Sequence, residues 1–169
     1  MSARHVPVLV FCALVLWLLG DLALAWPMLP QRIATHFNAV GYPNGWSSPG
    51  ALLSQLGVQL GLMTVLMLAA GWVDRLPDQL VNLPNKDYWL APERRAATYA
   101  ALRDWGRWFV TFVLAMLAYV ETASLHANLT PKPRLELEPW LLIAGSLAPA
   151  LAMIVWLYWR FRAPAAPTR

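Results

Sequence analysis

Apolar residues in this chain are gathered into four long blocks separated by shorter polar stretches. The blocks cover roughly Val6–Trp26, Ala51–Val73, Trp108–His126 and Pro139–Phe161. Each has about the 20 residues that a helix needs to cross the ~30 Å hydrocarbon core of a bilayer. An open strand would leave backbone N–H and C=O groups unpaired in lipid, so the spans must be helices. The pattern predicts an all-α fold, a four-helix transmembrane bundle in which residues 1–169 form a single integral membrane domain.

Composition also indicates lipid rather than water around these blocks. Hydrophobic residues make up 59% of the chain and charged residues 13%, about half the charged share of a typical soluble domain. The net charge of +4 is too small and too dispersed to suggest nucleic-acid binding. Arg4 and the small-residue pattern Ala23-Leu24-Ala25 make the first block resemble a cleaved secretory signal. Its apolar stretch runs long for a signal, which favours a retained helix.

The basic residues predict the orientation, because loops rich in Lys and Arg stay in the cytoplasm. Arg32, Lys132 and Arg134 lie in residues 27–50 and 128–138. The other ten of the 13 Lys and Arg residues lie near the termini or in residues 74–107. We therefore expect a protein of the bacterial cytoplasmic (inner) membrane, with both termini and the loop 74–107 inside.

Residues 27–50 form the loop expected outside, and it contains the run His36-Phe37-Asn38. In extended backbone, His36 and Asn38 would project from the same face. Pro43-Asn44-Gly45 is a turn signal, because Pro presets φ and Asn and Gly tolerate the left-handed region. The ligand- or partner-binding residues predicted in this loop are His36, Asn38, Asn44 and Trp46.

The cytoplasmic loop, residues 74–107, changes character at Pro92. The later residues are typical of a helix, which predicts one long helix from about Pro92 into the third span. The densest polar and aromatic set of the loop consists of Asn82, Asn85, Lys86, Asp87, Tyr88, Trp89, Glu93 and Arg94. Two interpretations stay open: a docking surface for a cytoplasmic partner or ligand, and a self-capped turn that fixes the long helix.

Two runs of sequence resemble a known family. LPQRIATHFNAVGYPNGW resembles the LP..I..HFN..G.PDGW signature of a bacterial membrane domain of unknown function, numbered 1648, which also forms the N-terminal part of SdpI-type immunity proteins. NLPNKDYWLAPERR resembles the NLPNK.YWL.PE.R segment of stand-alone members. The resemblance covers roughly residues 5–130, and Asn44 stands where the family often has Asp. It implies an integral membrane protein, and immunity to a secreted toxic peptide is an activity of relatives.

Ionisable residues near the outer ends of the spans are the candidates for a metal site. A divalent metal would use His36, Asp21, Glu121 and His126. Glu121 and His126 are about 140° apart around a helix and do not share a face, and neither an HExxH nor a paired CxxC spacing occurs. A polar network that orders the outer loop is the preferred interpretation, and no cofactor is predicted.

These features favour a non-enzymatic membrane protein that recognises a peptide or protein partner through its outer loop. Toxin immunity and sensing are the specific forms of this hypothesis. Gly57 and Gly61 form a GxxxG step that permits close helix approach, within the bundle or in a homodimer. The alternatives are a metal-binding membrane enzyme that uses the four candidate metal ligands, and a small accessory subunit of a membrane transport complex.

Overall fold

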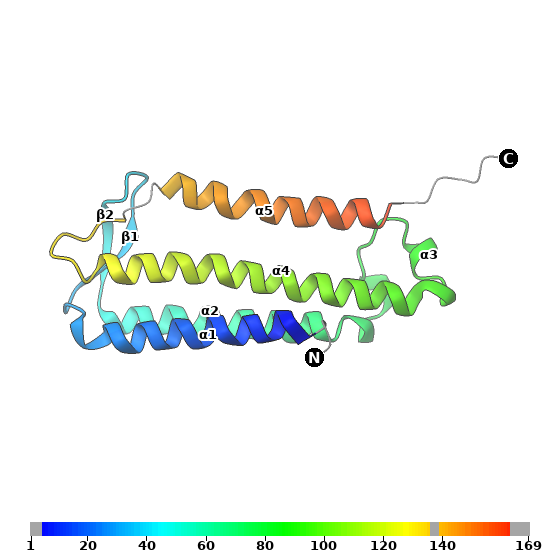
Figure 1. Cartoon of the computed structure of the whole chain (residues 1–169), viewed down its shortest axis with the longest axis horizontal. Coiled ribbons are helices and arrows are strands. Elements are labelled where there is room, and N and C mark those ends of the chain that lie inside the picture. Colours follow the sequence, from blue (N-terminus) through cyan, green and yellow to red (C-terminus); the bar gives the residue numbers. More distant parts are fainter. Residues whose placement is uncertain (1–4, 136–138, 163–169) are drawn as a thin grey trace.

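The computed structural model describes residues 5–135 and 139–162, which are mostly helical (Figure 1). Four long helices lie along the long axis: α1 (Val6–Ala25), α2 (Pro49–Gly71), α4 (Pro92–Ala127) and α5 (Pro139–Arg160). The short helices are η2 (Trp26–Met28), η3 (Val73–Arg75), η4 (Asp78–Leu80) and α3 (Lys86–Trp89). In Figure 1, α4 lies between α5 on one side and α1 and α2 on the other.

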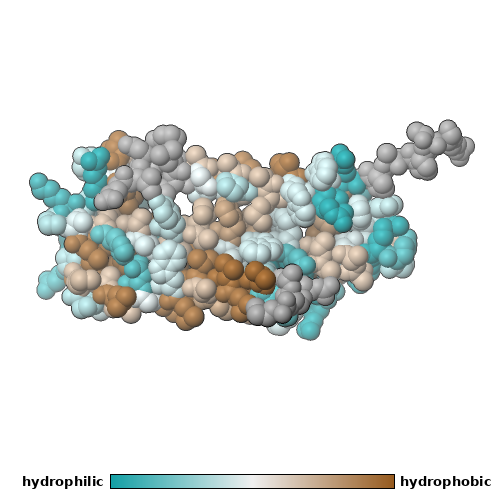
Figure 2. All heavy atoms as spheres, viewed as in Figure 1, coloured by the Kyte–Doolittle hydropathy of each residue, from teal (hydrophilic) through white to brown (hydrophobic). Residues whose placement is uncertain are grey.

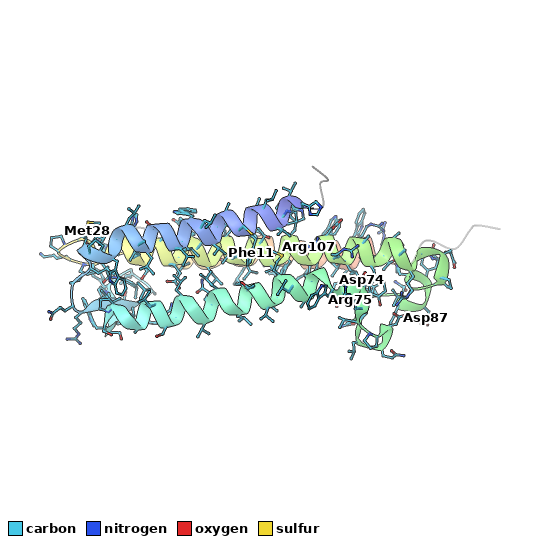
Figure 3. The ribbon with its side chains drawn as sticks, turned by 90° about the horizontal axis from the view of Figure 1, so that it is seen from below. Phe11, Met28, Asp74, Arg75, Asp87 and Arg107 are labelled. Atoms are coloured by element: carbon cyan, nitrogen blue, oxygen red, sulfur yellow. The ribbon has the colours of Figure 1, made fainter. Side chains whose placement is uncertain are left out.

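The two ends of the molecule differ. One end carries a β-hairpin, and we call it the hairpin end; the other carries α3 and is called the loop end (Figure 1). Helix α1 begins, and α5 finishes, toward the loop end. Figure 3 likewise shows Asp74, Arg75 and Asp87 toward one end and Met28 at the opposite end.

Three stretches of the described residues are long and apolar enough to cross a membrane. They are Val6–Met28, Pro49–Gly71 and Pro92–Ala127. Large apolar side chains on them are exposed rather than buried, among them Leu16, Leu24 and Val58. Figure 2 shows apolar surface along the middle of one face and hydrophilic residues gathered at the two ends. These helices indicate an integral membrane protein, because apolar surface of this extent is covered by lipid.

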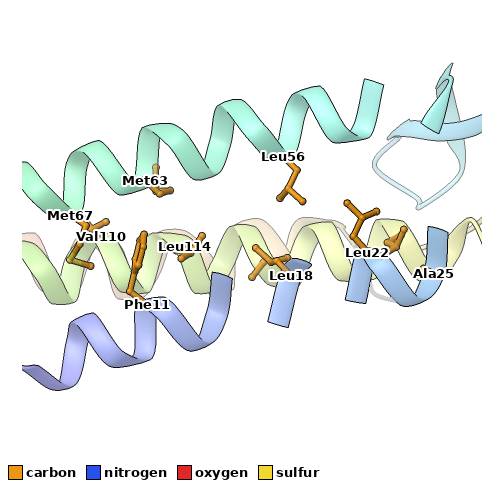
Figure 4. Close-up of a cluster of buried hydrophobic side chains, with 11 residues drawn as sticks. Phe11, Leu18, Leu22, Ala25, Leu56, Met63, Met67, Val110 and Leu114 are labelled. Atoms are coloured by element: carbon orange, nitrogen blue, oxygen red, sulfur yellow. The ribbon is translucent and has the colours of Figure 1, made fainter. Parts of the chain in front are cut away.

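A shared apolar core joins α1, α2 and α4 (Figure 4). Its central residue is Leu114 of α4, which is fully buried. Side chains of the other two helices surround it, chiefly Phe11, Leu18 and Leu22 of α1 and Leu56, Met63 and Met67 of α2. Between helices in lipid, such contacts stabilise through close packing rather than through removal of apolar surface from water.

Helix α4 is continuous from Pro92, as the sequence predicts. Pro92 occupies its first turn, where the missing N–H costs no hydrogen bond. Gly106 does not break the helix; a Cβ there would lie 3.1 Å from the Cβ of Ala70, so this glycine lets α2 approach closely. With 36 residues, α4 is about 54 Å long, well beyond the ~30 Å of a bilayer core.

The expectation of an all-α fold is wrong in the first loop. Strands β1 (Ile33–Phe37) and β2 (Pro43–Ser47) form an antiparallel two-stranded sheet. The predicted turn at Pro43-Asn44-Gly45 is also wrong, because these residues belong to β2. Pro and Gly are weak strand formers, so the sequence shows a turn where pairing with β1 imposes a strand.

The actual turn lies between Asn38 and Tyr42. The Oδ1 atom of Asn38 accepts the N–H groups of Val40 at 3.1 Å and Tyr42 at 3.0 Å. Gly41 has a φ of +81°, a region that glycine enters without steric cost. Asn38 therefore builds the turn, and the expectation that it extends the face of His36 is wrong.

The GxxxG residues of α2 are not used for packing between the described helices. A Cβ at Gly57 or at Gly61 would meet nothing within 4 Å. The interpretation that they pack within the bundle is therefore wrong. A homodimer through this face stays a prediction.

Candidate functional site

The hairpin end begins with the sheet that follows α1 and precedes α2. Ala34 pairs with Trp46 and His36 pairs with Gly45. A Cβ at Gly45 would lie 2.8 Å from the Cβ of His36, so any larger residue would force the strands apart. The pairing of the two strands therefore requires glycine at position 45.

The side chain of Asn128, the residue directly after α4, holds the hairpin. The Oδ1 atom of Asn128 accepts the N–H of Ala34 at 2.6 Å, and its Nδ2 donates to the Ala34 carbonyl at 2.9 Å. Asn128 is 4% exposed and Ala34 1% exposed. The amide thus satisfies both backbone groups of one strand residue, as a neighbouring strand would.

The segment after α4 also contacts the hairpin. The backbone N–H of Leu135 donates to the Gly41 carbonyl at 3.0 Å. A Cβ at Gly41 would lie 2.7 Å from the carbonyl oxygen of Leu135. Gly41 is therefore required both by its φ and by this close approach, which joins two loops far apart in sequence.

Two exposed aromatic rings of the hairpin each lie beside an arginine, and we call these four residues the aromatic–arginine face. Tyr42 and Trp46 are 51% and 43% exposed. The Arg32 guanidinium lies 5.8 Å from the Trp46 ring centroid, and that of Arg134 lies 4.8 Å from the Tyr42 ring. Trp, Tyr and Arg are the residues most enriched where protein partners bind tightly.

His36 and Asn44 contact each other beside this face. The Nδ1 atom of His36 lies 2.5 Å from Oδ1 of Asn44. Both side chains are exposed in this pair. Of the four residues predicted in this loop, three therefore remain near the hairpin surface, while Asn38 is used in the turn.

Beneath the hairpin, polar side chains meet in pairs rather than in one cluster. Asp21 of α1 and His126 of α4 approach to 2.8 Å, and Gln55 of α2 donates to Glu121 of α4 at 2.8 Å. The described residues contain no group of three or more His, Cys, Asp or Glu side chains that could hold a metal ion. These pairs tie α1 and α2 to α4 and include no residue of the outer loop, so the expected polar network that orders this loop stays a prediction.

Space inside the hairpin end is small. Two pockets here have volumes of about 20 Å³ each, and Glu121 contributes to both. This is room for little more than a water molecule. Neither of these two pockets could take a substrate or a side chain of a partner.

One comparison with known proteins gives a match, and the matched residues include the hairpin. Residues 8–57 match the family model described as a domain of unknown function (DUF1648). The chain carries a DUF1648 domain. No curated protein and no solved structure matched. The matched residues of the DUF1648 domain include most of α1, the hairpin and the first turns of α2, whereas Asn128 and Arg134 lie beyond them.

At the loop end, outside the matched residues of the DUF1648 domain, the run of Asn85 to Trp89 attaches α5. The Asn85 Nδ2 and Trp89 Nε1 atoms both donate to the carbonyl of Phe161, at 3.1 and 2.7 Å. The Trp89 and Phe161 rings meet edge to face, with centroids 5.4 Å apart. Carbonyls at a helix end lack partners within the helix, so these two side chains cap α5.

The other predicted residues of the loop lie around this cap. The Arg94 guanidinium lies 4.0 Å from the Tyr88 ring centroid and donates to the Tyr88 carbonyl at 2.7 Å. It also pairs with Glu93 at 2.8 Å. Lys86 is half-buried and Asp87 exposed on α3. The structure thus uses Asn85, Trp89 and Arg94 for internal contacts and leaves Asp87 facing outward.

Sequence reasoning missed a second attachment at this end. The Asp78 carboxyl accepts hydrogen bonds from Arg95 at 2.9 Å and from Tyr99 at 2.7 Å. The Arg95 guanidinium first, and then the Tyr99 hydroxyl, hold the pKa of the Asp78 carboxyl below its usual value. Arg95 and Tyr99 are four apart on α4 and therefore share a face. That spacing is a signal in the sequence, but it does not identify Asp78 as the partner.

Proposed function

We propose that this chain is a non-enzymatic protein of the bacterial cytoplasmic membrane that binds a peptide or protein partner on the outside. It would have four spans, with α5 as the fourth and both termini in the cytoplasm. The excess of Lys and Arg near the termini and in residues 74–107 supports this orientation. The structure supports it further, because the start of α1, the finish of α5 and α3 lie toward one end (Figure 1).

The aromatic–arginine face is the observation that carries the proposal. It stands on a hairpin whose position is fixed by Asn128 and by the backbone of Leu135. Rigid aromatic side chains bind with little loss of conformational entropy. Arg32 and Arg134 add guanidinium groups beside the two rings, and these groups can pair with acidic groups of a partner.

Helix α4 supplies a connection to the cytoplasm. Its hairpin end contacts β1 through Asn128, and its loop end holds Asp78 through Arg95 and Tyr99. A partner that shifts the hairpin therefore acts on a helix that continues past the bilayer. Sensing would use this connection, whereas immunity, the activity implied by the resemblance to SdpI-type proteins, would need only the outer contact.

The test compares growth and crosslinking in intact cells. A strain without the gene is exposed to peptides secreted by neighbouring bacteria and complemented with wild type or with Tyr42→Ala/Trp46→Ala. A photo-crosslinking residue at position 42 or 158 then reports what contacts each site. We expect sensitivity that wild type reverses and the double variant does not, with adducts at position 42 only.

The matched control is Tyr158→Ala/Trp159→Ala, which removes two exposed aromatic rings from α5. It should complement fully, provided that all variants reach the membrane in equal amounts. Normal growth of the deletion strain, together with no adduct at position 42, would reject the proposal.

A further inference from the structure

One of the two small pockets beneath the hairpin is bordered by polar residues of three elements. Thr35 of β1, Gln55 of α2, and Glu121 and Ser124 of α4 are among the residues that line it, and its volume is about 20 Å³. A pocket needs roughly 10–15 Å³ to hold one water molecule. This pocket therefore has the size of a single water molecule and lies where the hairpin meets α2 and α4.

Three polar groups of these residues have no hydrogen-bond partner among the described residues. The Oε1 atom of Glu121 accepts a hydrogen bond from Gln55 at 2.8 Å, which leaves the Oε2 atom without a partner. The hydroxyls of Thr35 and Ser124 likewise form no hydrogen bond with the described residues. Unlike the Oδ2 atom of Asp21, which is fully enclosed, these three groups keep surface that a small molecule can reach.

The position of Glu121 makes a second partner for its carboxyl group important. Glu121 is half-buried and lies in the apolar part of α4 that crosses the bilayer. Ionisable groups in such a span are costly, and they face the interior of the protein or water. A carboxylate can accept several hydrogen bonds, and Gln55 supplies one. The pocket is the place from which a further donor can reach this carboxyl group.

A water molecule matches these groups better than a metal ion does. Water can donate to the free oxygen of Glu121 and accept from the hydroxyls of Thr35 and Ser124. A metal cation attracts only oxygen lone pairs, so it would leave both hydroxyl hydrogens without an acceptor. Buried water molecules typically make about three hydrogen bonds to polar groups that otherwise lack partners. The three groups around this pocket provide that number.

We propose that one water molecule occupies this pocket and connects β1 to the pair formed by Glu121 and Gln55. It donates to the Glu121 carboxyl group and accepts from the hydroxyls of Thr35 and Ser124. Asn128 already holds Ala34, the residue before Thr35, so the water gives the same strand a second attachment. This bridge joins the outer loop to polar groups inside the span, and it does not depend on a partner outside.

A high-resolution crystal structure of the full-length protein in a lipidic mesophase tests the occupant directly. We expect one density peak in the pocket, about 2.7–2.8 Å from oxygen atoms of Glu121, Thr35 and Ser124, as hydrogen bonds between oxygens require. An empty pocket would overturn the proposal. A peak whose shorter distances to oxygen identify a metal ion would overturn it as well.

Two variants of Thr35 test the bridge without a crystal. Thr35→Val keeps the shape and removes the hydroxyl, so the protection factors of the backbone amides of residues 33–37 in nanodiscs should fall roughly five- to tenfold. Thr35→Ser keeps the hydroxyl and should stay near wild type. If Thr35 acted only as a good strand former, valine would protect the strand at least as well and serine less. That order would overturn the proposal.

A double variant tests whether Thr35 and Ser124 share one water molecule. Ser124→Ala should lower the protection of residues 33–37, although alanine favours the helix. Thr35→Val/Ser124→Ala should resemble either single variant, because the same water is lost in each. Independent, additive effects would overturn the proposal. None of these measurements involves crosslinking or growth, so the outer-partner proposal succeeds or fails separately.

Discussion

Asn128 shows how one side chain can replace a strand. Its amide bonds both backbone groups of Ala34, and the hydrogen bonds are shielded from water. The same Nδ2 atom lies 2.9 Å from the Ser124 carbonyl, one turn earlier in α4. The position of the hairpin relative to the membrane helices therefore depends strongly on a single residue.

Asn128→Ala should release the hairpin while leaving the helical core intact. The N–H and C=O groups of Ala34 would lose their partners, at about 1–3 kcal/mol for each group left unsatisfied. Hydrogen–deuterium exchange of residues 33–47 in lipid nanodiscs measures the effect, and faster exchange there is expected. Asn82→Ala, which changes an exposed asparagine of the other end, serves as control; equal exchange in both variants would contradict the prediction.

The sequence identifies some of these residues and not others for a physical reason. His36 and Trp46 stand in a short, distinctive run, and the structure places both at the hairpin surface. Asn128 and Ala34 are 94 positions apart, so no local pattern connects them. The aromatic–arginine face likewise depends on Arg134, which lies in the loop after α4, far from the hairpin in sequence.

At the scale of elements, the loop 74–91 connects α4 and α5 through side-chain contacts. Asn85 and Trp89 cap α5, and Thr98 of α4 donates to the Trp89 carbonyl at 2.8 Å. These contacts favour the structural interpretation of the NLPNKDYWL run over a free docking surface. They also extend it, because the run holds α5 as well as α4.

The attachment of Asp78 to α4 should depend on pH. Because hydrogen bonds from Arg95 and Tyr99 lower the folded-state pKa of the Asp78 carboxyl, its contribution is complete above the unfolded pKa of about 3.9. It is lost as the pH falls through the folded value. The protection factors of the backbone amides of residues 76–81, which are corrected for the intrinsic pH dependence of exchange, should therefore fall in wild type on acidification below about pH 4.

In Asp78→Asn, the backbone amides of residues 76–81 should be less protected from exchange already at pH 7, because no carboxylate remains to accept hydrogen bonds from Arg95. Asp87→Asn is the matched control and should behave as wild type at both pH values. An Asp78→Asn variant with wild-type exchange at pH 7 would show that this contact does not hold the loop.

Helices and strands differ in how well the sequence predicts them. The long helices follow from apolar blocks and from Pro92, which are local signals. The hairpin does not, because β2 contains Pro43 and Gly45, and its extended form depends on pairing with β1. The prediction of close packing at Gly57 failed for a related reason. A GxxxG step permits another helix to approach closely, but it does not determine whether a helix lies there.

At the scale of the whole molecule, sidedness is the main expectation to test. In a Cys12→Ser background, one cysteine is introduced by Asn44→Cys and another, in a separate variant, by Glu93→Cys. Cys12 is exposed on α1 and is removed so that each variant has one thiol. A membrane-impermeant maleimide should label Asn44→Cys in intact cells and Glu93→Cys only after permeabilisation.

The reverse labelling pattern would invert the topology and place the hairpin inside. Labelling of both sites in intact cells would mean that the chain does not cross the membrane as proposed. Cys12→Ser without a new cysteine should stay unlabelled and sets the background. The sequence predicts sidedness from charge alone, whereas the arrangement around α4 arises from contacts such as Leu114, whose neighbours come from three helices.

The central place of α4 has a consequence for how the protein is made. Ribosomes deliver the chain from the N-terminus, so α1 and α2 reach the translocation machinery before α4 has been synthesised. Asp21 and Gln55 then lack His126 and Glu121, and polar groups without partners are costly in lipid. The first two helices must therefore remain near the insertion site, or at the wet surface of the bilayer, until the third arrives and completes assembly.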